Sequence, residues 1–140
     1  MTTYSPKFPQ TPQVNAIDFV NSDGAGAANS EELVQGGANG SKVFYISAVS
    51  DDPSVDTTIS LYMVDASENK YPVGEVLIPD QSGFNSTTDP AKNVLDSDYL
   101  AWLPADNEII VPSGWSLHAV PKAAVTSSYT VTLTAFFSDY

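Results

Sequence analysis

Residues 128–137 read SYTVTLTAFF, and this stretch decides the fold class of the 140-residue chain. Apolar residues stand at every second position from Val131 to Phe137, with threonines between them up to Thr134. A period of two places the apolar side chains on one face of a β-strand and the threonines on the other. The sequence therefore predicts a strand with one buried face.

Similar short runs precede this stretch, and most of them end at proline. They are rich in β-branched and aromatic residues, which favour strands, and they span Val43–Val49, Thr57–Val64, Tyr71–Ile78, Tyr99–Leu103, Glu108–Val111 and Trp115–Val120. Thr57–Val64 and Tyr71–Ile78 flank a turn at Asp65–Asn69 and are predicted to form a hairpin. No window of about 11–18 residues keeps a helical period. We therefore predict an all-β fold, namely a single jelly-roll-like antiparallel β-sandwich.

An extended N-terminal arm is predicted ahead of the sandwich. Pro6, Pro9 and Pro12 recur at a spacing of three residues, and Tyr4 and Phe8 stand among them. Proline favours extended backbone and cannot donate a hydrogen bond to a sheet. The alternative is a frayed terminus, but the aromatic residues favour an arm that makes contacts.

The domain boundary is expected at residue 31. The run Asp23–Ser30 is composed of Gly, Ala, Asn, Ser and Asp, which is typical of a loop. We expect residues 1–30 to form the arm and this Gly/Ala-rich loop, and residues 31–140 to form the sandwich. A second long polar segment, Asp80–Asp98, is expected to be a functional or interface loop.

Charge excludes several classes of function. The chain has 17 acidic residues and five basic ones, all lysine, and its net charge is −12. Because phosphate recognition depends on arginine and lysine, we expect no nucleic-acid partner and no contact with an anionic membrane surface. No run approaches the roughly 20 apolar residues of a membrane span, and no apolar signal-peptide core is seen. The absence of cysteine excludes disulfides and thiolate metal sites.

The candidates for catalysis are weak, and we expect neither an enzyme nor a cofactor. His118 is the only histidine, and alternation along its strand turns it away from the apolar residues. Ser113 and Ser116 are close to it in sequence, but Pro112-Ser113-Gly114 is a turn pattern rather than a nucleophile elbow. Gly24-Ala25-Gly26 lacks the lysine and the helix of a phosphate-binding loop.

Acidic residues cluster in the expected loops, at Asp51, Asp52, Asp56, Asp96 and Asp98. Their spacing does not match a calcium-binding EF-hand loop. We interpret them as solvated loop residues; a loosely held cation and a glycosidase-like pair remain the alternatives.

The two tryptophans, Trp102 and Trp115, stand in strand-like runs with apolar neighbours. Packing in the core is therefore the preferred interpretation for both. The alternative is an exposed platform on which a sugar ring stacks.

Turn motifs between Val34 and Tyr140 carry a resemblance to a known group of proteins. They are the entry Gly37-Ala38-Asn39-Gly40-Ser41, the hairpin, the turn Pro112-Ser113-Gly114-Trp115-Ser116-Leu117 and the ending Ser138-Asp139-Tyr140. In this order they resemble small structural proteins of tailed phages, of the capsid decoration or cement type.

The resemblance implies a virion protein, made in the host cytoplasm, that binds the outer capsid surface and bridges neighbouring subunits. The implied partners are the major capsid protein and further copies of the chain, in a trimer. A net charge of −12 suits an outer surface, because the inner surface faces DNA. The arm lies outside the resemblance; we expect its contact residues to be Tyr4, Pro6, Phe8, Pro9 and Pro12. The alternative function is a carbohydrate-binding module of a tail or baseplate.

Overall fold

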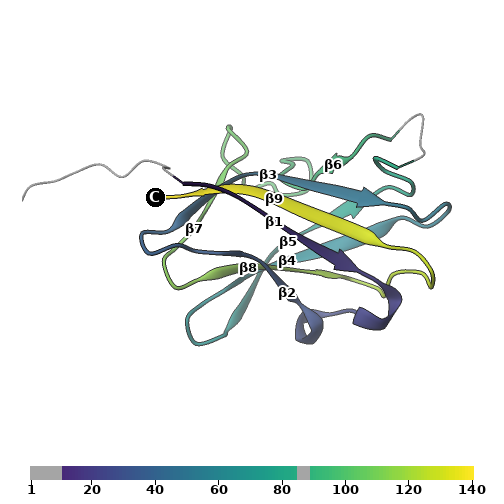
Figure 1. Cartoon of the computed structure of the whole chain (residues 1–140), viewed down its shortest axis with the longest axis horizontal. Coiled ribbons are helices and arrows are strands. Elements are labelled where there is room, and N and C mark those ends of the chain that lie inside the picture. Colours follow the sequence, from purple (N-terminus) through teal and green to yellow (C-terminus); the bar gives the residue numbers. More distant parts are fainter. Residues whose placement is uncertain (1–10, 85–88) are drawn as a thin grey trace, which may run out of the picture.

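The computed structural model describes residues 11–84 and 89–140, which form two antiparallel β-sheets packed face to face (Figure 1). The first sheet contains β1 (Thr11–Phe19), β9 (Val131–Asp139) and β3 (Ser41–Ser50), and β3 also pairs with β6 (Lys92–Asn93) and β7 (Ile109–Val111). The second sheet has the order β2 (Glu31–Gln35), β8 (Ser116–Pro121), β4 (Thr57–Val64) and β5 (Lys70–Ile78). The predicted all-β sandwich is confirmed.

The strands pair in a nested manner along the chain. β4 pairs with β5 in the predicted hairpin, β3 with β7, β2 with β8, and β1 with β9. The chain thus resembles one long antiparallel ribbon folded over itself, with β4 and β5 at its closed end. Each such pair lies within one sheet, and the successive pairs alternate between the two sheets.

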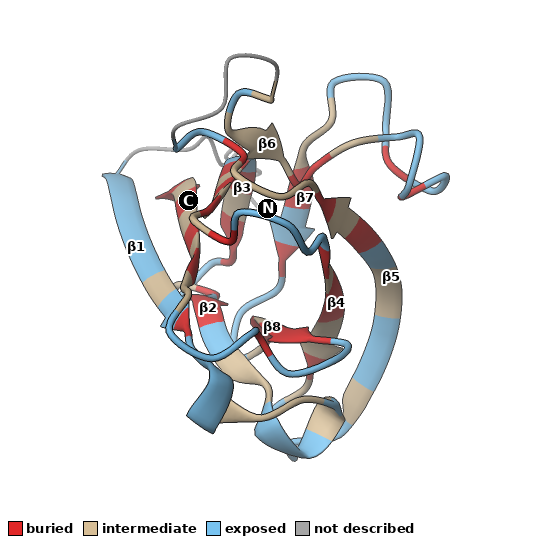
Figure 2. Ribbon diagram, turned by 90° about the vertical axis from the view of Figure 1, so that its right-hand side faces the viewer, coloured by how far each residue is buried: buried red, intermediate tan, exposed pale blue. Residues whose placement is uncertain are grey.

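The N-terminal boundary of the sandwich differs from the prediction. Thr11–Phe19 pairs with β9 along its whole length, and Phe19 is fully buried. The sandwich therefore includes residues that were expected in the arm, and the boundary at residue 31 is wrong. Pro12 is tolerated because β1 pairs on one side only, and an edge strand does not need every N–H group. Figure 2 shows β1 exposed along most of its length.

The expected loop after β1 is present and covers part of the second sheet. It contains two short 3-10 helices, η1 (Asn21–Asp23) and η2 (Ala27–Asn29). The Gly26 N–H donates to the Pro121 carbonyl at 3.2 Å, and Lys70 Nζ donates to the Ala27 carbonyl at 2.5 Å. This cover accounts for the burial of Val120, which lies on the outer side of the sheet and outside the main core.

The main core lies between the two sheets. Its largest fully buried side chains include Phe19, Ile46, Leu61, Leu117 and Leu133. The alternation predicted for β9 is confirmed, because Val131, Leu133 and Ala135 are fully buried. No helix in the described part of the chain is long and apolar enough to cross a membrane.

Candidate functional site

The outer face of the first sheet carries a row of exposed apolar side chains. Directly paired residues point to the same side of an antiparallel sheet, and the residues paired with the outward side of β9 define this face. With the residues that pair in turn with β3, they are Pro12, Val14, Ala16 and Asp18 on β1, Thr132, Thr134, Phe136 and Ser138 on β9, Lys42, Tyr45, Ser47 and Val49 on β3, Asn93 on β6 and Ile110 on β7. We call this set the outer face.

Apolar side chains occupy the centre of the outer face. Val14, Phe136 and Tyr45 form one row across β1, β9 and β3. The rings of Tyr45 and Phe136 meet edge to face, with centroids 5.9 Å apart, and Val14 is 62% exposed. A β-bulge between Val43 and Tyr45 inserts Phe44, so that two successive aromatic residues are exposed where simple alternation would bury one.

Charge is nearly absent from the outer face, and its two charged residues have partners. The Thr132 hydroxyl donates to Asp18 Oδ1 at 2.6 Å, and Lys42 Nζ lies 2.6 Å from Glu108 Oε2. The hydrogen bond to Glu108 is the main reason why the pKa of Lys42 is raised. The face itself thus holds one acidic and one basic residue in a chain of net charge −12. Depletion of charge is typical of the centres of protein–protein interfaces.

The size of the outer face sets the strength of contact that it can make. From Pro12 to Asp18 it extends roughly 20 Å along the strands, and the three strand spacings from β1 to β7 span about 14 Å. With side chains included, its area is on the order of 400 Å², against about 800 Å² per partner in a standard stable interface. One outer face alone is therefore too small for tight binding.

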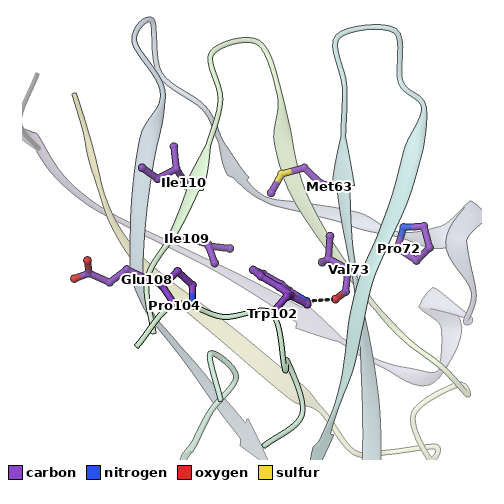
Figure 3. A pocket seen from close by; sticks show the side chains of 8 residues that line it. All are labelled: Met63, Pro72, Val73, Trp102, Pro104, Glu108, Ile109 and Ile110. Carbon is purple, nitrogen blue, oxygen red and sulfur yellow. Dashed lines mark hydrogen bonds between the residues drawn. The ribbon is translucent and has the colours of Figure 1, made fainter. Parts of the chain in front are cut away.

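A second feature is an apolar groove at the edge of the sandwich. It has a volume of about 510 Å³ and is lined by Met63, Pro72, Val73, Trp102, Pro104, Glu108, Ile109 and Ile110. Figure 3 shows Trp102 lying between Val73 of β5 and Ile109 of β7. The loop that carries Trp102 thus reaches from one sheet to the other.

A bulge in β5 positions Trp102. Leu61 pairs with Gly74 and Tyr62 with Pro72, so Val73 is the extra residue. Its carbonyl accepts a hydrogen bond from Trp102 Nε1 at 2.5 Å. Gly74 leaves room for Leu100, since a Cβ atom at Gly74 would lie 2.3 Å from Leu100 Cδ2. Pro72 and Gly74 within the strand pattern of Tyr71–Ile78 are the sequence signal that could have indicated an edge strand with a bulge.

The tryptophan prediction is half wrong. Trp115 packs against the core and stacks on Tyr71, with ring centroids 5.8 Å apart. Trp102 is 48% exposed instead of buried in the core. Its apolar neighbours in sequence, Leu100 and Leu103, fill the core and leave the indole at the surface.

His118 lies on the outer side of the second sheet, in a polar pocket of about 400 Å³ that also contains Glu32, Glu68 and Lys70. Its Nδ1 atom is 3.2 Å from Ser30 Oγ, a partner that the sequence did not indicate because it is 88 residues away. Burial lowers the pKa of His118, and nearby Glu32 only partly opposes this. Among the described residues, no carboxylate forms a hydrogen bond with His118, so the orienting acid of a catalytic triad is missing.

The loop aspartates stabilise turns. Asp51 accepts a hydrogen bond from the Thr130 N–H, and Asp56 accepts one from the Asp80 N–H. Asp96 accepts from the Asp98 N–H at 2.9 Å and pairs with Lys92. In the described ranges, no cluster of three acidic or histidine side chains could hold a metal ion.

Asp52 is the buried member of this group, with 1% of its surface exposed. It accepts hydrogen bonds from the N–H groups of Ser54 and Val55, both at 3.0 Å. Burial acts to raise the pKa of Asp52, but hydrogen bonds to the carboxylate outweigh it and the pKa lies below its ordinary value. Its role is thus to hold the turn after β3.

Of the predicted arm residues, the structure places only Pro12. It lies on exposed strand β1 opposite Ser138, at the margin of the outer face. Tyr4, Pro6, Phe8 and Pro9 lie outside the described residues.

No protein-family model matches the chain, and no curated protein matches it either. The resemblance to phage structural proteins therefore stays a prediction.

Proposed function

We propose that the protein is a virion structural protein that binds the outer surface of a capsid and cements neighbouring subunits, with the major capsid protein as its partner. The observation that carries the proposal is the outer face: a surface with an exposed aromatic centre and only one acidic and one basic residue, on a strongly acidic chain. Such a surface can bury area against a protein partner while bringing only one of its own acidic residues, Asp18, into the contact.

The connectivity supports the same proposal. Nested strand pairing across two sheets is what we expect of the jelly-roll-like sandwich, an architecture that occurs in viral capsid and lectin domains. The turn motifs that resemble tailed-phage structural proteins agree with it.

The modest area of the outer face favours attachment through several contacts at once. A trimer would present three outer faces to the particle, and linked contacts raise the overall affinity far above that of each one. The arm residues Tyr4, Pro6, Phe8 and Pro9 would lie on an adjacent subunit and add to the buried area, while Pro12, in β1, would contribute from the margin of the outer face. The function is assembly by buried surface, without catalysis.

The test is to place one acidic residue on the outer face of the full-length protein. Val14→Asp introduces a charge at the most exposed apolar position, and Val55→Asp, on a loop away from the face, is the matched control because Val55 is 48% exposed. Attachment is measured by co-sedimentation with capsid particles assembled without the protein. We expect at least about a tenfold loss for Val14→Asp and none for Val55→Asp, because an interface disfavours an unpaired buried charge. Undiminished attachment of folded Val14→Asp refutes the proposal.

The exposed indole of Trp102 favours a second candidate function, a carbohydrate-binding module in a tail or baseplate. The indole N–H is already bonded to Val73, so the exposed part of the ring is available for stacking. Titration with a glycan library, followed by isothermal titration calorimetry, tests this candidate, because the heat of binding does not depend on the indole as a reporter. A saturable signal that disappears in Trp102→Phe or Trp102→Ala would support it and would count against the capsid proposal.

A further inference from the structure

We propose that the groove beside Trp102 receives residues 1–10 of a second copy of this chain. The inference goes beyond the proposed function, because it concerns contact between copies and does not depend on the particle that they bind.

The chemistry of the groove defines its occupant. Its walls are apolar side chains from β4, β5 and β7 and from the loop of Trp102 and Pro104. Trp102 is fixed by its hydrogen bond to Val73, so no indole N–H is left for a polar ligand. The single acidic residue of the lining, Glu108, is paired with Lys42 at 2.6 Å. A narrow apolar chain segment without acidic residues is therefore the best occupant, and aromatic-lined grooves commonly take proline-rich segments.

Residues 1–10 have this chemistry. They contain Tyr4, Pro6, Phe8 and Pro9, one lysine and no acidic residue. The remaining 130 residues carry four lysines and all 17 acidic residues, which gives them a net charge of −13. The segment thus carries a charge of opposite sign to the net charge of the rest of the chain. Prolines three residues apart lie on one edge of a polyproline helix, which has about three residues per turn.

Geometry favours a second copy over the same copy. Thr11 lies in one row with Asp139, Ser41 and Val111, so β1 and the groove are at opposite edges of the first sheet. To reach its own groove, the segment would have to turn sharply at residues 10–11 and cross β9, β3 and β7. Pro9 and Pro12 oppose such a turn, because proline-rich chains are stiff and extended. In the extended direction, ten residues cover about 31 Å, which is enough to reach a neighbouring molecule.

The experiment uses full-length chains altered in either half of the proposed contact. Phe8→Asp alters the segment and leaves the groove intact; Pro104→Glu alters the exposed rim of the groove and leaves the segment intact. The matched controls are Thr3→Asp in the segment and Val55→Glu on the body. Association is measured by sedimentation velocity, and thermal unfolding checks that each variant is folded.

We expect the wild type and both controls to associate, and each altered chain to associate at least about tenfold more weakly, since either variant places a charge in an apolar contact. An equimolar mixture of Phe8→Asp and Pro104→Glu should associate again, because the intact segment of one chain can enter the intact groove of the other. A monomeric wild type, an oligomer insensitive to Phe8→Asp, or a mixture that stays dissociated would each overturn the inference. None of these outcomes bears on Val14→Asp in the capsid assay, so the two proposals fail separately.

Discussion

Replacing Gly74 with alanine should destabilise the sandwich strongly. The added Cβ atom would lie 2.3 Å from Leu100 Cδ2, and Leu100 is 1% exposed, so it has little space into which to move. Overpacking of this kind costs about 1–3 kcal/mol, and a non-glycine residue at a φ of +155° adds strain of the order of 1–2 kcal/mol. The free energy of unfolding should therefore decrease by roughly 2–5 kcal/mol. For 140 residues, this corresponds to a decrease in melting temperature of about 7–17 °C.

The matched control for this substitution is Gly26→Ala. Gly26 also has a positive φ, +82°, but an added Cβ atom would meet nothing within 4 Å. Gly26→Ala should therefore lower the free energy of unfolding through backbone strain alone, by about 1 kcal/mol or somewhat more. Both variants are measured by urea unfolding followed by circular dichroism. The reasoning about Leu100 is refuted if Gly74→Ala costs no more than Gly26→Ala, or if combining it with Leu100→Ala gives strictly additive losses.

Three further perturbations follow from the contacts of single side chains. Asp52→Ala should cost about 2–3 kcal/mol in urea unfolding at pH 7, because two N–H groups lose a buried acceptor; a loss below about 0.5 kcal/mol contradicts this. The pKa of His118 is lowered in the folded state, so the unfolded chain binds the proton first and the free energy of unfolding should decrease as the pH falls below about 6.5. His118→Gln should abolish this dependence of the unfolding free energy on pH between pH 7 and 5. An unchanged dependence would exclude His118 as its source. Lys122→Met should change the stability by less than about 0.5 kcal/mol, because its 3.0 Å contact with Glu75 is solvent-exposed; a larger loss, or sensitivity to salt, would show that the pair matters.

Strands with one buried face were predictable, and strand β1 was not. In β9 every second side chain enters the core, so the period of two is visible in the sequence. In β1 the inward positions hold Gln13 and Asn15, and only Ile17 and Phe19 are apolar. An edge strand that buries so little leaves a weak pattern, and the proline at its start points toward an arm.

The outer face could not be found from the sequence, because it exists only through the register of the strands. Val14 and Phe136 are far apart in the chain and become neighbours in the pairing of β1 with β9. Tyr45 joins them only because a bulge shifts the register of β3 by one residue. The low charge of the outer face likewise cannot be recognised from the sequence, because the net charge of the whole chain does not show how the charged residues are distributed over the surface. By contrast, the net charge of −12 and the absence of cysteine, which limit the partners and the chemistry, are direct properties of the sequence.

The pairing of β1 with β9 also determines how the molecule responds to mechanical load. Thr11, where β1 begins, lies opposite Asp139, and this is the first of nine residue pairs that end at Phe19 and Val131. Tension applied to residue 10 along the strand axis loads all of these pairs together in shear, whereas tension across the sheet peels them apart one after another. A neighbouring molecule that pulls the N-terminal segment along the axis of β1 therefore meets the higher mechanical resistance, because all nine pairs must break together. A neighbouring molecule that pulls across the sheet could detach β1 from the sandwich by breaking the pairs one at a time.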